Sequence, residues 1–504
     1  MATIRDLLLA RTEDDSPALR WREGDTIRTL TWREYVAAAA RLATVLQERL
    51  DPVLPPHVGV LLDNGPAWPL HLAAAGLGGH VVVGVNTTRR GSAQDADIAK
   101  ADCQFVVDTP AVALAAVNDK VPVSTEAAPT GDDLFMLIFT SGTSGDPKAV
   151  RVTHHKVTAP AAHLTDKLGL TRADVHYCSM PMFHSNAVLA AWGPAVHNGA
   201  AFCCAPFSAS RFIDDVRDFG ATFVNYVGKP LTYILSTEPR TNDADNPLRL
   251  AFGNEAGDRD MAAFAQRFDC RVVDGFGSTE NAVVISRTPD TPPGALGAPA
   301  EGVKVLDPET GEERPPAHYD EHGAITNLDD AVGELVNTRG AGQFAGYYND
   351  EAATAERLRG GMYWSGDLAY RDTDGWIHFA GRTSDWLRVD GENLAAAPIE
   401  RILLRHPAIN EAAVFGVPDP QGGDQLAVAL VLRAELSPTA FGDFLDQQED
   451  LGPKQWPRLV RVVEELPRTA TNKVLKRRLD SGGFDWERQP RERVFRPSGS
   501  QPSD

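Results

Sequence analysis

The sequence predicts an α/β protein of at least two domains, and three observations support this class. The chain has 504 residues, whereas single domains usually comprise about 100–200 residues. Strand-like and helix-like runs alternate along its first third, which is typical of a mostly parallel sheet covered by helices. From about residue 385 a second and shorter α/β pattern begins.

The first third of the chain supplies the alternation. An amphipathic run rich in Ala, Leu and Arg predicts a helix, and short apolar runs predict buried strands. Pro69 is compatible with a helix because it falls in the first turn. The predicted elements are, in order, helix 31–50, strand 57–62, helix 67–76, strand 80–85 and strand 104–107.

The remaining elements are shorter and more interrupted. Residues 285–330 contain many prolines, so short strands and loops are expected there. The residues after Leu479 are rich in Gly, Pro, Arg and Ser, which predicts an irregular tail. Between these regions the pattern predicts helix 398–405, strands 412–417 and 426–432, and helix 439–446.

Composition narrows the class of protein. Hydrophobic residues make up 43% and charged residues 23% of the chain, as in soluble globular proteins. No apolar run reaches the roughly 18 residues of a membrane span, and the apolar stretch near the start is too short for a signal peptide. The five cysteines are odd in number and lack metal-site spacing, so a reducing, cytoplasmic location is expected.

The net charge is -20, which argues against a nucleic-acid partner because such binding requires a basic face. A small polyanionic ligand would need a site that is locally positive within this repelling protein. The placement of single lysines and arginines near glycine-rich loops is therefore informative.

The strongest chemical signal runs from Leu134 to Lys148 with the sequence LFMLIFTSGTSGDPK. A buried-strand run ends in glycines and hydroxyls, followed by a lysine. Glycines let the backbone approach an anion, and N–H groups and hydroxyls can hold phosphate. Pro147 stands where a Walker A loop has its second glycine, so this is a different phosphate loop. A flexible Ser/Gly turn is the less favoured alternative for the whole string.

Three weaker motifs follow, and each alone is also consistent with a turn or a solvated side chain. The segment Asp274–Glu280 (DGFGSTE) offers an aromatic ring that could stack on a base and a carboxylate that could hold a hard cation. Asp367, in YWSGDL, could bind the hydroxyls of a ribose, and Arg382 could add charge-assisted bonds. Lys473 lies in a loop with the sequence LPRTATNKV.

In this order and at these spacings, the motifs resemble the adenylate-forming superfamily of acyl-CoA synthetases, luciferases and peptide-synthetase adenylation domains. The resemblance extends from about Leu30 to Leu479 and includes MPMFH at 180–184. It also includes GEL at 333–335 and GYY at 346–348. Shorter segments (NYVGKP, LRLAFGN, RTSD and GEN) look like the very-long-chain acyl-CoA synthetase and fatty-acid-transport branch. The soluble actinobacterial relatives of that branch include enzymes for steroid side-chain acids.

The resemblance implies a fold and its domains. A large N-terminal domain of layered sheets and helices, built from several subdomains, is expected over 1–382. A small and mobile α+β C-terminal domain is expected over 383–480, with the hinge at Ser384. The tail 481–504 is expected to be irregular. Its arginines could touch phosphates of coenzyme A, although a solvated end is the preferred interpretation for Arg488, Arg491, Arg493 and Arg496.

The resemblance also implies an ATP-dependent ligase that activates an acid as acyl-AMP and transfers it to coenzyme A, with Mg²⁺ as cofactor. The implied catalytic residues are Lys473, Glu280 and Thr140, of which Glu280 and Thr140 would also hold the metal. The implied ATP- and AMP-binding residues are Thr140, Ser141, Gly142, Thr143, Ser144, Gly145, Lys148, Asn254, Glu255, Asp274, Gly275, Phe276, Gly277, Ser278, Thr279, Asp367, Arg382 and Lys473.

Two further groups of residues follow from the resemblance. The implied acyl pocket is lined by His184, Gly193, Val227 and Gly228. The implied loop on the coenzyme A side contains Arg388, Gly391, Glu392 and Asn393. The chain departs from the family pattern at Asn472, where a glycine usually precedes the catalytic lysine. Asparagine tolerates left-handed backbone well, so presentation of that lysine is still expected.

Several alternatives stay open on the sequence. One is an acyl-AMP ligase that passes the acyl group to a carrier protein, and another is a non-catalytic relative that binds nucleotide or acyl groups. The substrate is either a long-chain fatty acid or a steroid side-chain acid. Neither the oligomeric state nor peripheral contact with a membrane can be read from the residues.

Overall fold

A computed structural model describes residues 2–118, 128–140, 147–321, 323, 325–382, 386–389, 392–418, 424–452, 455–468, 474–479, 483–488 and 494–498. The chain divides into two compact units. Unit 1 consists of Met1–Asn281 and Gln343–Glu356, and unit 2 consists of Ala282–Gly342 and Arg357–Asp504. This division differs from the expected domains 1–382 and 383–480, and the mobility of a C-terminal domain stays a prediction.

The first sheet of unit 1 has the strand order β5-β3-β4-β6-β7. The strands β5, β3, β4 and β6 run parallel, and β7 pairs antiparallel with β6. In sequence order the bounds are β3 His57–Val60, β4 Val81–Gly84, β5 Phe105–Val107, β6 Leu134–Thr140 and β7 Lys148–Thr153. The strands predicted at 57–62, 80–85 and 104–107 are thus confirmed.

The second sheet of unit 1 has the order β12-β11-β10-β8-β9-β1-β2. All neighbours in it are parallel except the hairpin β1–β2. The bounds are β1 Pro17–Glu23, β2 Thr26–Thr31, β8 Val175–Cys178, β9 Ala201–Cys204, β10 Phe223–Val227, β11 Leu250–Asn254 and β12 Arg271–Asp274.

Helices cover these sheets, as expected for parallel sheets. Helix α2 (Trp32–Gln47) begins with a capping box, in which Thr31 and Glu34 each accept a hydrogen bond from the other's backbone N–H. Every residue of α3 (Ala67–Gly78) is buried, since it packs against α1, α2, α5 and β4. The other helices are α1 Ile4–Leu9, α4 Ser92–Lys100, α5 Ala111–Asn118, α6 His154–Leu168, α7 Gly193–Asn198, α8 Phe212–Phe219, α9 Pro230–Leu235, α10 Asp258–Phe268 and α12 Glu351–Arg357.

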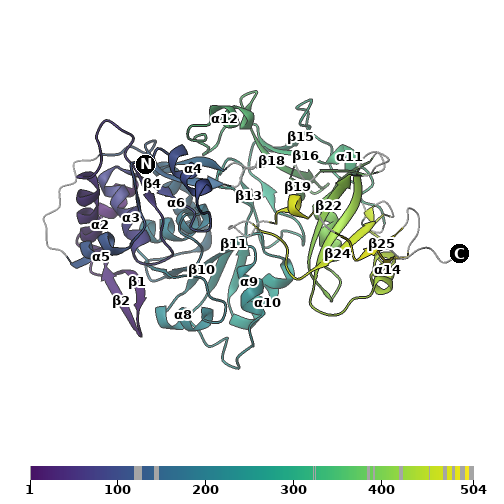
Figure 1. The fold of residues 1–504 in the computed structure, drawn as a ribbon, viewed down its shortest axis with the longest axis horizontal. Helices are drawn as coiled ribbons and strands as arrows, with labels where there is room; N and C mark the ends of the chain where they lie inside the picture. Colours follow the sequence, from purple (N-terminus) through teal and green to yellow (C-terminus); the bar gives the residue numbers. More distant parts are fainter. Residues whose placement is uncertain are drawn as a thin grey trace. The chain divides into compact units, whose positions relative to one another are not determined.

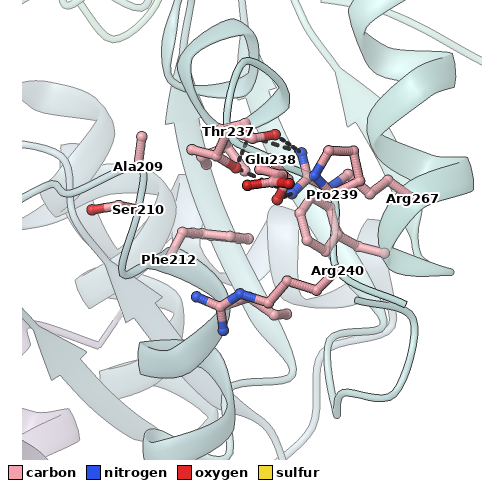
Figure 2. A pocket seen from close by; sticks show the side chains of 11 residues that line it. Ala209, Ser210, Phe212, Thr237, Glu238, Pro239, Arg240 and Arg267 are labelled. Atoms are coloured by element: carbon pink, nitrogen blue, oxygen red, sulfur yellow. Dashed lines mark hydrogen bonds between the residues drawn. The ribbon is translucent and has the colours of Figure 1, made fainter. Parts of the chain in front are cut away.

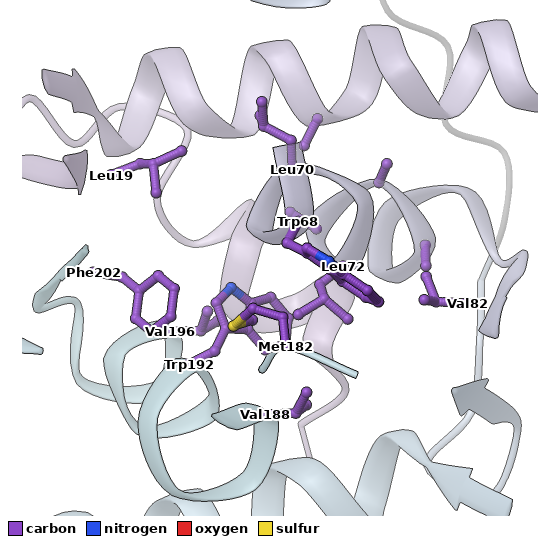
Figure 3. Packing of buried hydrophobic residues seen from close by; sticks show 14 of the residues in the cluster. Leu19, Trp68, Leu70, Leu72, Val82, Met182, Val188, Trp192, Val196 and Phe202 are labelled. Atoms are coloured by element: carbon purple, nitrogen blue, oxygen red, sulfur yellow. The ribbon is translucent and has the colours of Figure 1, made fainter. Parts of the chain in front are cut away.

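The main hydrophobic core of unit 1 lies around α3 and a π-helix, η1 (Asn186–Trp192). Figure 3 shows Trp68 and Leu72 of α3 beside Met182 and near Trp192 of η1. Trp192 Nε1 donates a hydrogen bond to Tyr35 Oη at 3.1 Å. The Tyr35 hydroxyl in turn donates to the carbonyl of Pro69 at 2.5 Å. Packing and a buried hydrogen-bond chain therefore fix η1 against α2 and α3.

Unit 2 contains an antiparallel sheet of order β15-β16-β18-β17, with β19 paired to β18. A second sheet has the order β22-β23-β24-β25-β26 (Figure 1). The bounds are β13 Ile285–Ser286, β14 Ala298–Pro299, β15 Val303–Leu306, α11 Leu328–Ala331, β16 Gly333–Asn337, β17 Leu358–Arg359, β18 Met362–Arg371, β19 Ile377–Arg382, β20 Trp386–Val389, β21 Glu392–Ala395, α13 Ala396–Leu403, β22 Ile409–Pro418, β23 Asp424–Leu432, α14 Pro438–Asp446, β24 Leu459–Val463, the 3₁₀ helix η4 Lys476–Arg478, β25 Trp486–Glu487 and β26 Arg496–Pro497.

The described part of the tail differs from the irregular, solvated end that its composition predicts. β25 pairs with β24, and β26 pairs with β25, so the tail extends the second sheet of unit 2. Trp486 and Phe495 are buried against Phe441, with ring centroids 5.8 and 5.1 Å away. Arg488 is buried as well and donates to the carbonyls of Trp456 and Pro457 at 2.7 and 3.0 Å. These apolar contacts outweigh the local composition.

No helix among the described residues has both the length and the apolar character needed to cross a membrane. The five cysteines are free thiols.

Candidate active site

The functional segments of unit 1 lie where parallel strands end. β8, β10, β11 and β12 are parallel neighbours, and in such sheets ligands bind at the carboxyl ends of the strands. Predicted site residues leave the sheet at this edge: His184 after β8, Val227 and Gly228 at β10, Asn254 and Glu255 at β11, and Asp274 at β12. The structure therefore brings part of the predicted nucleotide set (Asn254, Glu255 and Asp274) and part of the predicted acyl pocket to one edge.

A chain of side-chain amides connects these strand ends. Asn254 Nδ2 donates to the carbonyl of Gly275 at 2.5 Å, and Asn254 Oδ1 accepts from Asn186 Nδ2 at 3.3 Å. Asn225 Nδ2 donates to Asn186 Oδ1 at 2.6 Å. Glu255, directly after Asn254, has a φ of 65°, a left-handed conformation that non-glycine residues seldom adopt outside tight turns and functional sites. The amides thus tie η1 to the loop that follows β12.

Asp274 closes β12, and neighbouring strands hold its carboxylate. Tyr226 Oη donates to Asp274 Oδ2 at 3.0 Å, and the N–H of Ala256 donates to the same oxygen at 3.2 Å. At Gly253, opposite Asp274 in the sheet, an added Cβ would lie 2.2 Å from the carbonyl oxygen of Tyr226. The close approach of β10 and β11 therefore requires glycine there.

The loop after Asp274 presents its middle to solvent. Gly277 and Ser278 are exposed, and Phe276 is half-buried. Thr279 shares a hydrogen bond of 2.9 Å with Ser185, which follows His184 in the segment after β8. The loop is thus anchored at both ends and open between them.

Glu280 is held by two residues that are distant in sequence. Tyr347 Oη donates to Glu280 Oε1 at 2.8 Å, and Lys156 Nζ donates to the Glu280 carbonyl at 2.9 Å. Burial lowers the pKa of Lys156 to about 8, while the negative charge of Glu280 opposes this shift. The motifs do not identify Lys156, because its partner lies 124 residues away along the chain.

The base of the predicted phosphate loop is formed by Thr140 and Lys148, which face each other across β6 and β7. Thr140 Oγ1 donates to the carbonyl of Lys148 at 3.4 Å. Lys148 Nζ lies 5.3 Å from the ring centroid of Tyr347 and 3.6 Å from a carboxylate oxygen of Glu356. Tyr347 therefore stands between the loop lysine and the carboxylate of Glu280. The loop residues Ser141, Gly142, Thr143, Ser144 and Gly145 lie outside the described residues.

In unit 2, Asp367 and Arg382 are cross-strand partners on β18 and β19, and Arg382 Nε lies 3.6 Å from Asp367 Oδ1. The part of β18 before Asp367 is fixed by Glu334, which accepts from the N–H of Gly366 at 2.6 Å. Burial raises the pKa of Glu334, although this bond and Arg359 oppose the shift. The predicted ribose-binding pair is thus adjacent within its own unit.

The remaining predicted residues are placed only in part. Gly193 begins α7, where an added Cβ would lie 3.0 Å from the carbonyl of Val188 and 3.2 Å from Val157, so this glycine serves close packing in the core. Arg388 and Asn393 are register partners in the hairpin β20–β21, and Glu392 begins β21. Three predicted residues lie outside the described residues: Ser384, predicted as the hinge, Gly391, and Lys473, predicted as catalytic.

A cavity of about 470 Å³ lies elsewhere in unit 1, among α8, α9 and α10 (Figure 2). Its two arginines are already paired with carboxylates. Arg240 makes two hydrogen bonds to Asp214, at 2.6 and 3.1 Å. Arg267 donates to Asp243 and to several backbone carbonyls, including that of Thr237. None of the predicted site residues lines this cavity.

The donors at this edge include one carboxylate suited to a divalent cation. Among the described residues, no three His, Cys, Asp or Glu side chains converge as a metal cage. Magnesium is commonly held by one or two carboxylates together with substrate phosphates and water. Glu280, a single carboxylate connected through Tyr347 to the base of the phosphate loop, fits that arrangement.

A mixed α/β fold with side chains gathered where parallel strands end is typical of ligand-binding α/β enzymes. The model of the AMP-binding enzyme family matches residues 9–348, and that of the AMP-binding enzyme C-terminal domain matches residues 398–473. The chain therefore belongs to the AMP-binding enzyme family. The superfamily predicted from the four motifs is confirmed.

Individual relatives cover nearly the whole chain. A medium/long-chain-fatty-acid–CoA ligase (FadD17) of Mycobacterium marinum is 50% identical and covers 96% of this chain and 97% of its own length. A steroid-22-oyl-CoA synthetase of Rhodococcus jostii is 46% identical and covers 95% of this chain and 90% of its own length. The solved structure of ATP-bound MatB from Rhodopseudomonas palustris is 24% identical, with a TM-score of 0.79 over 95% of this chain and 98% of that chain. This last match confirms the fold.

Proposed function

We propose that this protein is an ATP-dependent acyl-CoA ligase that converts a fatty or steroid side-chain acid into its CoA thioester through an acyl-AMP intermediate. Two relatives named as CoA ligases or synthetases of lipid acids, 50% and 46% identical over nearly the full length, support this activity. The structural observation that supports it is the position of Glu280, whose carboxylate accepts a hydrogen bond from Tyr347. The ring of Tyr347 lies beside Lys148 at the base of the predicted phosphate loop.

The first half-reaction joins the acid to AMP. A carboxylate oxygen attacks the α-phosphorus of ATP, the bond to the bridging oxygen breaks, and pyrophosphate leaves. Two unit charges about 4 Å apart repel by about 4 kcal/mol at an effective dielectric constant near 20. We infer that Lys473 lies between the two anions in the reacting state and stabilises the transition state, because a fixed positive charge there offsets this repulsion.

The other proposed contacts follow from position and chemistry. Lys148 would hold the outer phosphates, and Phe276 would lie against the adenine. Asp367 would accept hydrogen bonds from the ribose hydroxyls, and Arg382 would assist it. Magnesium, held by Glu280 with Thr140 nearby, would supply positive charge to the phosphates when bound.

The second half-reaction releases AMP. The sulfur of coenzyme A attacks the acyl carbonyl carbon, its proton is lost to solvent or a base, and the carbon–oxygen bond to AMP breaks. We propose that the hairpin containing Arg388 and Asn393 borders the path of the thiol after the C-terminal domain turns about Ser384. His184, Val227 and Gly228 would border the acyl group.

The decisive experiment measures pyrophosphate release with ATP and Mg²⁺ across a panel of acids, with and without coenzyme A. The panel contains short, medium and long fatty acids, steroid side-chain acids and aromatic acids. We expect a thioester product with medium or long fatty acids or with steroid side-chain acids. Acyl-AMP release without thioester would favour transfer to a carrier protein, and no turnover with any acid would favour a binding protein.

The role of Lys473 can be tested separately with Lys473→Ala. Removal of the charge between the reacting anions is expected to lower pyrophosphate release by about 100-fold or more. ATP binding, measured by calorimetry, is expected to stay within a few-fold of the parent protein. Unchanged pyrophosphate release would contradict the assigned role.

A further inference from the structure

Glu280 is fixed from two sides by segments that lie far from it in the chain. Its carboxylate accepts from Tyr347 Oη at 2.8 Å, and its carbonyl accepts from Lys156 Nζ at 2.9 Å. The next residue, Asn281, has a φ of 52° and donates through Nδ2 to Gln343 Oε1 at 2.7 Å. Side chain and backbone at this point are therefore both restrained.

Lys156 lies on α6 and is only 1% exposed. At this depth its ammonium group cannot touch a ligand bound at the strand ends, so its effect must pass through Glu280. A buried ammonium group is costly unless it is paired and hydrogen-bonded. The carbonyl of Glu280 supplies its hydrogen bond, and the negative charge of Glu280 favours the charged lysine.

Tyr347 is equally well fixed. It forms an antiparallel bridge with Val150 of β7, and its N–H donates to Thr354 Oγ1 at 2.9 Å. The ring is 5% exposed and lies against Lys148. Its hydroxyl therefore reaches Glu280 from a rigid backbone.

We propose that Lys156 and Tyr347 are positioning residues that hold Glu280 ready to ligate the divalent cation accompanying ATP. We call these three residues the Glu280 clamp. This inference rests on the proposed function, because the role of Glu280 toward the metal is itself part of that proposal. A carboxylate aligned before the metal arrives loses little conformational freedom on binding, and this favours affinity.

The test compares the affinity for ATP with Mg²⁺ and with EDTA, measured by calorimetry without any acid, so that no turnover occurs. The ratio of the two affinities is the metal-dependent gain. For Tyr347→Phe and Lys156→Met we expect this gain to fall about tenfold, which corresponds to loss of one hydrogen bond at a charged group. The affinity for AMP in EDTA is expected to change less than about twofold.

Matched controls separate positioning from general stability. Tyr348 is the next residue, and its hydroxyl donates to Asp102 Oδ2 at 2.8 Å, so Tyr348→Phe removes a similar bond elsewhere. Lys167 is an exposed lysine on the same helix as Lys156, so Lys167→Met removes an equal charge. Both controls are expected to keep the full metal-dependent gain. Melting of each apo variant verifies that it is folded, and Tyr347→Phe carries the test if Lys156→Met does not fold.

Double variants that include Glu280→Gln show whether the clamp or the metal role of Glu280 is wrong. If the clamp acts through Glu280, Tyr347→Phe should add little to the loss caused by Glu280→Gln, since coupled residues are not additive. A loss with Glu280→Gln and none with Tyr347→Phe or Lys156→Met would overturn the clamp and leave the proposed function intact. An unchanged gain with Glu280→Gln would overturn both the clamp and the metal role of Glu280.

Discussion

Single side chains at the strand ends are held by protein neighbours before any ligand binds. Asp274 accepts from Tyr226 and from the N–H of Ala256, and Asn254 connects Asn186 to the carbonyl of Gly275. Such fixed donors and acceptors cost little reorganisation when the substrate arrives. These hydrogen bonds therefore orient the loop that follows β12.

Asn254→Ala is predicted to weaken ATP binding more than acid binding. The variant removes the hydrogen bond to the Gly275 carbonyl and frees the loop that carries Phe276. We expect the KM for ATP to rise about tenfold, the equivalent of one hydrogen bond, and the KM for the acid to change less than about threefold. Asn246→Ala is the control, because its amide also donates to backbone carbonyls, but those of Asp243 and Phe268. Equal effects on both substrates would contradict this role.

At the scale of the residue, the motifs indicate which side chains are expected to touch a ligand. They do not indicate the protein groups that hold those side chains. Glu280 and Asp274 lie in a motif with recognisable chemistry. Lys156 carries no local signal, because its partner lies 124 residues away along the chain. Asn225 opens the segment NYVGKP, but its contact with Asn186, 39 residues away, is not indicated by that segment. Side-chain partners at such separations depend on tertiary packing, which short motifs do not encode.

Among the elements, the buried helices and strands were predictable because continuous apolar runs mark them in the sequence. The helix predicted at 67–76 is α3, and the strands predicted at 412–417 and 426–432 are β22 and β23. The hairpin β1–β2 was missed, since its second strand is largely exposed and its pattern is weak. β25 and β26 were missed because each is only two residues long.

The tail is predicted to stabilise the second sheet of unit 2. Phe495 is 2% exposed and packs edge-on against Phe441, so Phe495→Ala removes a large buried group. Such truncations typically cost about 3–5 kcal/mol in the free energy of unfolding, and urea denaturation would measure the loss. Val494→Ala is the control, since that side chain is 54% exposed. A loss for Phe495→Ala no larger than for Val494→Ala would show that the tail contributes little.

For the molecule as a whole, stability should decline in mild acid. His71 and His80 are buried in unit 1, and their ring nitrogens have no hydrogen-bond partner among the described residues. Burial lowers the pKa of His71 to about 4 and that of His80 to about 3, where the nearby His71 adds to the shift. Unfolded histidines titrate near about pH 6.5. In mild acid these two histidines therefore bind protons in the unfolded chain but stay neutral in the folded chain.

The sign of this effect follows from linkage. The two neutral histidines make their full contribution to the free energy of unfolding above about pH 6.5. That contribution is lost progressively as the pH falls toward about 4. Between about pH 7 and pH 5 we expect a loss of about 2 kcal/mol per histidine in the free energy of unfolding. His71→Leu should reduce the loss by about that amount, whereas His163→Leu, at an exposed position on α6, should leave it unchanged. A pH dependence unaffected by His71→Leu would contradict the assignment.

The membership of residues 343–356 in unit 1 has a consequence for synthesis on the ribosome. Tyr347 is made 67 residues after the Glu280 that it contacts, and residues 282–342 of unit 2 are made between them. At about 5–20 residues per second, the delay is on the order of several seconds. A nascent chain can assemble most of the first unit in that interval, but the proposed metal-binding edge at Glu280 stays incomplete. Neither ATP nor a cation could then stabilise the growing protein through this edge until the segment around Tyr347 has left the exit tunnel.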